Sequence, residues 1–187
     1  MTRATVSLIF VFARTGLASG LCSGFSVLLP PLAVLLPGAI FGVAISQSID
    51  GSIESLRRDS KVSLVGCSTV AYIAAIVAAL LSMRLTGFDN GLLSTAIAGA
   101  IAGGVGALLV ALSIYVEVSR LHSRRMVLFV TLSGAVLGAL VLLIGVYISD
   151  HTRFGHPFDD LVVYPLWQAG VAAAIPVFRR GRALAAR

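Results

Sequence analysis

The stretch LLSTAIAGAIAGGVGALLVALSIYV, residues 92–116, contains no charged residue. A helix of about 20 mainly apolar residues crosses the hydrocarbon core of a bilayer, which is about 30 Å thick. A surface helix of a soluble protein carries a polar face instead, and this stretch has none. Residues 92–116 therefore predict a transmembrane helix.

Five further apolar stretches flank this one. The sequence predicts helices over about 4–27, 31–48, 62–83, 92–116, 126–149 and 161–178, with a kink at Pro37. Six spans of about 20 residues use roughly 120 positions, which leaves only short loops. Only 12% of the 187 residues are charged, against about 25% in soluble domains. We therefore expect an all-α fold in which residues 1–187 form a single integral membrane domain, a polytopic bundle of six transmembrane helices.

The 14 Lys and Arg residues are sorted between the two sets of loops. Those in one set or at the termini are Arg3, Arg57, Arg58, Lys61, Arg120, Arg124, Arg125, Arg179, Arg180, Arg182 and Arg187. Arg84 and Arg153 lie in the other set. Short loops rich in Lys and Arg stay in the cytoplasm. We therefore expect a multi-pass protein of the cell (inner) membrane with both termini cytoplasmic. The net charge of +6 indicates contact of cytoplasmic Arg side chains with anionic lipid headgroups rather than nucleic-acid binding.

An alternative topology has five spans, with residues 1–14 lying flat on the membrane. An interfacial helix shows one polar face, whereas apolar side chains surround the predicted first helix: Val6, Leu8, Ile9, Phe10, Val11 and Phe12. Five spans would also put the two basic termini on opposite sides of the membrane. The sequence therefore favours six spans.

Small residues recur at four-residue spacing on five predicted helices. The sets are Gly16, Gly20 and Gly24; Gly38 and Gly42; Ala71, Ala75 and Ala79; Gly99 with Gly103 and Ala102 with Gly106; Gly134 and Gly138. This spacing lets helix backbones approach closely in lipid. We interpret these faces as packing surfaces, within the bundle or against a membrane-protein partner or second copy; sliding surfaces of a transporter are the alternative. The similarity of GAIFG (38–42) to GAVLG (134–138) would suit an inverted repeat of helices one to three and four to six.

Arg14 is the one basic residue inside a predicted span. It lies about 15 Å into a core about 30 Å thick. A central Arg costs about 2.5–3.5 kcal/mol on insertion scales and normally faces the bundle interior or a water-filled cavity. We therefore predict that Arg14, Gln168 and Trp167 form a ligand-binding cavity for a small anionic solute. Alternatively, the Arg14 side chain extends to the inner lipid headgroups.

The His, Asp and Cys residues give only weak indications of a metal site or a catalytic site. His151, His156 and Asp159 lie together in one predicted outer loop and are candidate metal ligands. Cys22 and Cys67 lie in apolar stretches, where they are expected to be small buried residues. No Asp or Glu lies within a predicted span, and all three His lie in predicted loops. We therefore predict no catalytic residues, no cofactor and no enzyme activity.

Two function classes remain after these exclusions. The first is a small-solute transport or solute-binding membrane subunit with a cavity near Arg14 and Gln168. The second is a non-catalytic scaffold or accessory subunit of a larger membrane complex. The six-span layout with both ends inside is similar to that of the substrate-binding membrane components of vitamin importers. The similarity is one of layout alone, because no motif of that family occurs in the chain.

Overall fold

A computed structural model of the chain describes residues 3–26, 34–85, 91–151 and 160–178, without the side chains of 149–151 and 160. These residues form six α-helices and no strand. The helices are α1 (Arg3–Ser26), α2 (Leu36–Ser52), α3 (Arg58–Leu85), α4 (Leu92–Glu117), α5 (Arg124–His151) and α6 (Asp160–Ala174). Two 3-10 turns, η2 (Ser119–Leu121) and η3 (Ile175–Phe178), follow α4 and α6. The predicted all-α fold is confirmed for this part of the chain.

Five helical segments are long and apolar enough to cross a membrane: Arg3–Ser26, Arg58–Leu85, Leu92–Glu117, Arg124–Ile148 and Leu161–Phe178. The remaining helix, α2, has 17 residues, which gives a length of about 26 Å at 1.5 Å per residue. Most of its side chains are buried among the other helices. The structure therefore supports a membrane protein with five candidate spans, and α2 is a shorter, enclosed sixth helix.

The predicted kink at Pro37 is wrong. Pro37 lies in the first turn of α2, where the missing N–H would have no helical acceptor in any case. The helix accordingly begins at Leu36 rather than near residue 31 and extends past the predicted end to Ser52. Asp50 therefore lies in the last turn of α2 rather than in a loop.

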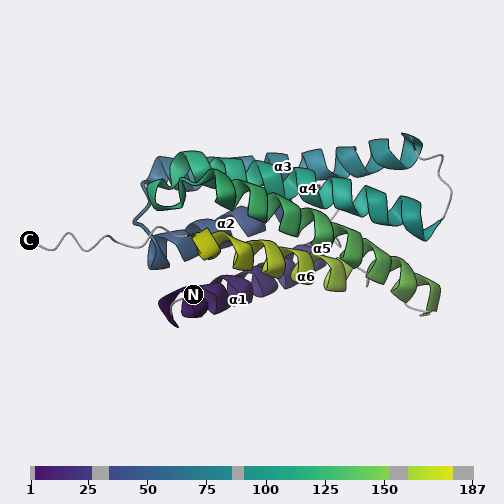
Figure 1. The fold of residues 1–187 in the computed structure, drawn as a ribbon, viewed down its shortest axis with the longest axis horizontal. Helices are drawn as coiled ribbons and strands as arrows, with labels where there is room; N and C mark the ends of the chain where they lie inside the picture. The colour runs from purple at the N-terminus through teal and green to yellow at the C-terminus, as the bar shows by residue number, and fades with distance from the viewer. Residues whose placement is uncertain (1–2, 27–33, 86–90, 152–159, 179–187) are drawn as a thin grey trace, which may run out of the picture.

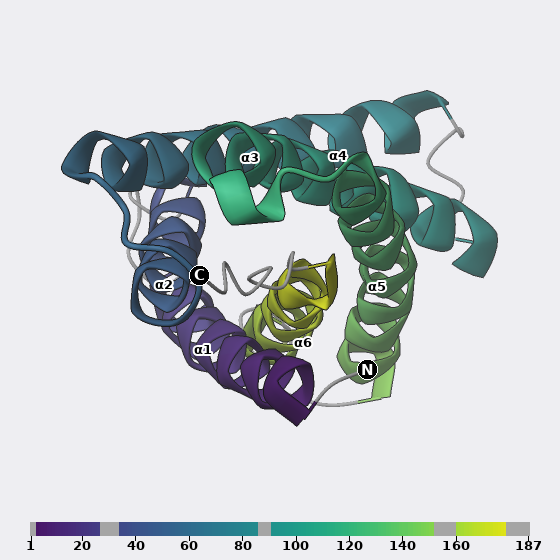
Figure 2. The ribbon, with the colours of Figure 1, turned by 60° about the vertical axis from the view of Figure 1, so that its left-hand side comes forward.

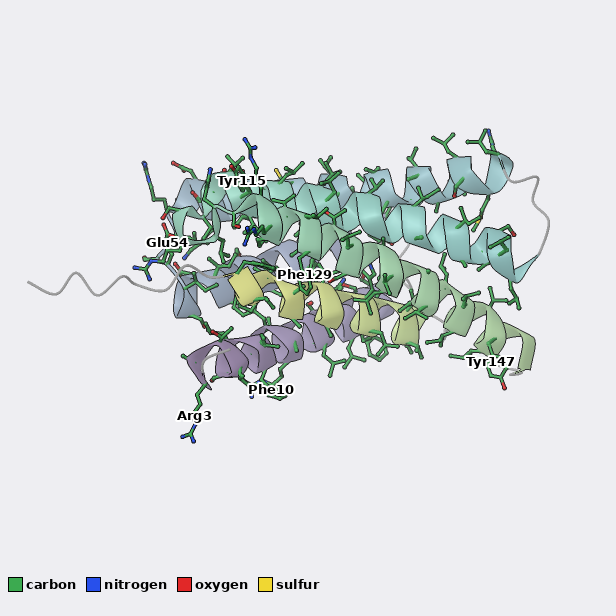
Figure 3. The ribbon with its side chains drawn as sticks, in the orientation of Figure 1. Arg3, Phe10, Glu54, Tyr115, Phe129 and Tyr147 are labelled. Atoms are coloured by element: carbon green, nitrogen blue, oxygen red, sulfur yellow. The ribbon has the colours of Figure 1, made fainter. Side chains whose placement is uncertain are left out.

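Successive helices run in opposite directions along the long axis of the molecule (Figure 1). Each helix packs against the next in sequence, and α6 packs against both α5 and α1, which closes the bundle into a ring (Figure 2). Consequently the beginning of α1 and the end of η3 lie at the same end of the bundle. In Figure 3 Arg3, Glu54 and Tyr115 mark this end, and Tyr147 marks the opposite one.

Most charged side chains of the described residues gather at the end marked by Arg3, which we call the charged end. They are Arg3, Asp50, Glu54, Arg57, Arg58, Asp59, Lys61, Glu117, Arg120, Arg124 and Arg125. Arg84 lies near the other end of α3. Among the described residues, the fold thus brings the basic side chains other than Arg14 and Arg84 to one end of the bundle.

Glycines set the closest helix contacts. A Cβ on Gly16 would lie 2.5 Å from the carbonyl oxygen of Gln168 in α6, and a Cβ on Gly42 would lie 2.7 Å from Cα of Val65 in α3. Gly103 similarly meets the backbone of Gly134, which brings α4 against α5. Any larger side chain would push these backbones apart. The small-residue faces on α1, α2, α4 and α5 are therefore packing surfaces between helices of this chain.

Candidate ligand cavity

A cavity of about 240 Å³ lies inside the ring, lined by side chains of α2, α3, α4, α5 and α6. The larger or polar lining side chains are Phe41, Ser68, Tyr72, Tyr164, Trp167 and Gln168. No charged residue belongs to the lining described by the structure. The cavity uses the first turns of α2, the middle of α3 and α4, and α6 from Val163 to Gln168. It therefore extends from the middle of the bundle towards the end opposite the charged end.

The ring interior near the charged end is filled by apolar side chains. Ile49, Ile114, Leu121, Met126 and Ile175 are all 0% exposed and come from five different elements near the charged end. We call these five residues the apolar seal. Phe129 of α5 and Phe178 of η3 add an edge-to-face pair beside it, with ring centroids 5.4 Å apart. The bundle is thus packed at the charged end and hollow towards the other.

Four aromatic side chains form one wall of the cavity. The rings of Phe41 and Trp167 have centroids 5.9 Å apart and are tilted by 55°. The rings of Tyr72 and Tyr164 have centroids 5.9 Å apart, and their hydroxyl groups are hydrogen-bonded to each other. The indole N–H of Trp167 donates to the carbonyl oxygen of Gly134 at 3.2 Å. These contacts hold the aromatic side chains in fixed positions around the cavity.

Gln168 is the most tightly held polar residue of the lining, at 3% exposure. The Ser19 hydroxyl lies 2.7 Å from Oε1, and Nε2 donates to the Ser23 hydroxyl at 3.0 Å. Ser23 Oγ lies 2.8 Å from the Ser19 carbonyl oxygen and 3.3 Å from that of Pro37. An amide group can donate two hydrogen bonds and accept two. One N–H and one lone pair of Gln168 therefore have no partner among the described residues.

Ser68 of α3 is a second polar group in the lining. Its hydroxyl oxygen is buried and makes no hydrogen bond to any described residue. A buried hydroxyl without a partner costs about 1–3 kcal/mol, so such groups usually have a function or a bound molecule. Sequence patterns gave no indication of Ser68, Phe41 or Tyr72, because the relation of α2 and α3 to α6 is set by the fold.

Of the three predicted cavity residues, the structure brings Gln168 and Trp167 together but not Arg14. Arg14 is exposed on the outer face of α1 and does not line the cavity. The reason is helical geometry: Arg14 precedes Gly16 by two residues, which turns it by about 200° around the axis. Gly16 and Ser19 face α6, so Arg14 faces away from it. Binding of a ligand by any of the three residues stays a prediction.

The predicted metal residues cannot be placed together. His156 and Asp159 lie outside the described residues, as does the side chain of His151. Among the residues that the structure describes, no group of His, Cys, Asp and Glu could hold a metal ion. Cys22 and Cys67 are free and exposed, so the expectation that they are buried is wrong.

Polar contacts join the loops at the charged end. Glu54 accepts hydrogen bonds from the Ser119 hydroxyl at 2.9 Å and from the backbone N–H of Arg120 at 3.1 Å. Asp50 forms an ion pair with Lys61 at 2.8 Å. The hydrogen bond from Lys61 and that from the Leu56 backbone N–H hold the pKa of Asp50 below its usual value. These contacts connect α2, α3 and η2 beside the apolar seal.

The polar groups of the cavity lining are hydroxyl, amide and indole groups. Such groups can bind and orient a molecule through hydrogen bonds. No family model, no curated protein and no solved structure matches the chain. The cavity is therefore the main structural indication of function.

Proposed function

We propose that the chain is a multi-pass membrane protein that binds a small uncharged solute in the cavity, as a transport or solute-binding subunit. The observation that carries the proposal is the contrast between the cavity and the filled interior at the apolar seal. A hollow in an otherwise packed interior costs stability. Such a cost is reasonable where the space is used by a ligand.

The chemistry of the lining indicates the kind of solute. An engineered apolar cavity of about 150 Å³ takes up benzene, so a cavity of about 240 Å³ accommodates a small aromatic or heterocyclic molecule. The aromatic wall favours a flat apolar body. Gln168 and Ser68 suit one or two hydrogen bonds. An ion would lose its hydration without gaining a charged partner, so we propose a neutral solute in place of the anionic one expected from Arg14.

The charge distribution supports an orientation. Basic residues dominate the charged end, and such residues stay on the cytoplasmic side. We therefore propose that the charged end is cytoplasmic, that α2 is the sixth membrane-embedded helix, and that the cavity extends from the middle of the membrane towards its outer side. In this orientation the apolar seal separates a bound solute from the cytoplasm.

Trp167 gives a direct test, since it is the one tryptophan of the chain and lines the cavity. We expect 4-bromobenzamide, an uncharged molecule with a heavy atom, to quench the fluorescence of the purified protein saturably. Its charged analogue 4-bromobenzoate serves as the comparison. Ala102→Leu, which narrows the cavity, should weaken the quenching at least tenfold, whereas Val70→Leu on the exposed face of α3 should not. Linear quenching that is equal in all three proteins would disprove the site.

The scaffold class stays as the second candidate. The scaffold prediction used the small-residue faces as partner surfaces, but the glycine faces of α1, α2, α4 and α5 are occupied by helices of the same chain. Purification in mild detergent distinguishes the two classes. A fixed-ratio complex without quenching favours the scaffold, and a chain alone with saturable quenching favours solute binding.

A further inference from the structure

The position of Arg14 in the membrane follows from two independent measures. It is the twelfth residue of the 24-residue helix α1. Gly16, two residues further on, packs against Gln168 and Ala169, which lie near the middle of the apolar segment Leu161–Phe178. Arg14 is therefore at mid-height in the bundle, about 16 Å along α1 from Arg3.

At this height the side chain is exposed on the outer face of the bundle. Its neighbours one turn away are Phe10, which is 71% exposed, and Leu17, which is 43% exposed. Figure 3 shows Phe10 directed away from the other helices. A guanidinium group has five N–H donors and a positive charge. The outer face of α1 thus presents a cation in a surface that is otherwise suited to lipid tails.

Among the described side chains, no carboxylate lies at this height, because Asp50, Glu54, Asp59 and Glu117 all lie at the charged end. The described part of the chain therefore supplies no carboxylate partner for Arg14. A second copy docked on the same face would bring two Arg14 side chains together, which is electrostatically unfavourable. Charged residues within spans usually pair with a residue of opposite charge. Charge complementarity therefore favours, as the partner of Arg14, a different protein whose transmembrane helix carries Asp or Glu at mid-membrane.

We propose that the outer face of α1 centred on Arg14, with Phe10, Leu17 and Leu21, binds a transmembrane helix of another protein through a carboxylate in its middle. This proposal does not depend on the cavity. The alternative, in which Arg14 extends past Phe10 to lipid phosphates at the charged end, is an outcome of the test.

The test uses a labelled Leu-rich transmembrane peptide with one central Asp, reconstituted with the full chain in phosphatidylcholine vesicles. A fluorescent acceptor on Cys67 of α3, with Cys22→Ser, keeps the label off the α1 face. We expect energy transfer to show that the Asp peptide binds about five- to thirty-fold more tightly than the same peptide with Leu at that position. Arg14→Leu should abolish this difference, and Arg14→Lys should keep most of it.

Equal binding of the Asp and Leu peptides would overturn the proposal, as would a preference that survives Arg14→Leu. Transfer between differently labelled copies without peptide would instead show self-association and also overturn it. Because Arg14 is exposed, the substitutions should not affect folding, which thermal unfolding checks. A photo-crosslinker at Leu17 in the native membrane gives a second readout. A crosslinked span containing Asp or Glu supports the proposal, and crosslinks to lipid alone contradict it.

Discussion

The Ser19 hydroxyl lies 2.7 Å from the Oε1 atom of Gln168, and this contact joins the first helix of the bundle to the last. Both residues are at least 95% buried, so the contact is formed without water. It closes the ring and fixes the amide that faces the cavity.

The first prediction concerns this contact. Ser19→Ala and Gln168→Leu should each destabilise the protein, and the double mutant should be less destabilised than the sum. The coupling should be about 0.6 kcal/mol, the average for hydrogen bonds between transmembrane helices. Unfolding in detergent micelles measures it. Thr69→Ala combined with Gln168→Leu is the control and should show no coupling, because Thr69 bonds within α3.

A second prediction compares two glycines. A side chain on Gly20 would meet the backbone of Pro165 and Tyr164, whereas one on Gly66 would meet nothing within 4 Å. Gly20→Leu should therefore separate α1 from α6 and cost at least the 1–3 kcal/mol typical of overpacking. Gly66→Leu should leave the melting temperature nearly unchanged. A Gly20→Leu protein as stable as wild type would show that α1 and α6 do not pack as described.

The third prediction concerns the hydroxyl of Ser68. Because it is buried without a hydrogen bond to the described residues, Ser68→Ala should raise the stability of the empty protein by about 1 kcal/mol. Ser113→Ala, which removes a buried hydroxyl bonded to the Val110 carbonyl, should not. If Ser68 bonds the solute, the same change should weaken the saturable quenching of Trp167. A gain in stability together with weaker quenching would assign Ser68 to the binding site.

The fourth prediction is a pH dependence. The pKa of Asp50 is lowered in the folded state, so its contribution to stability is present above the unfolded value of about 3.8. It is lost as the pH falls through the lower, folded value. The difference in melting temperature between wild type and Asp50→Asn should therefore be largest near neutral pH and shrink below about pH 4. The Asp50 side chain is 32% exposed, so high salt should reduce the difference.

The helices were predictable from sequence because long apolar stretches leave few alternatives. The start of α2 was not, since Pro37 in an apolar stretch is compatible with either a kink or a first turn. The sequence does contain a pattern that indicates the orientation of Arg14. Gly16, Ser19 and Ser23 recur at helical spacing and mark the packed face, which places Arg14 on the opposite one.

The cavity itself was only partly predictable. Gln168 and Trp167 were identified because polar and aromatic residues are unusual inside a span. Phe41 and Tyr72 lie in segments where an aromatic residue is unremarkable, and no local pattern relates them to α6. Their contribution depends on the closure of the ring, which is a property of the whole chain.

The pairing of α1 with α6 also has a consequence for biosynthesis. Ser19 and Gln168 are separated by 149 positions in the chain. At translation rates of about 5–20 residues per second, α1 is made roughly 7–30 s before its partner. During this interval Gly16, Ser19 and Gly20 lack the α6 backbone and side chains against which they pack. Truncation before α6 should therefore leave this face of α1 uncovered and expose the chain to membrane quality control.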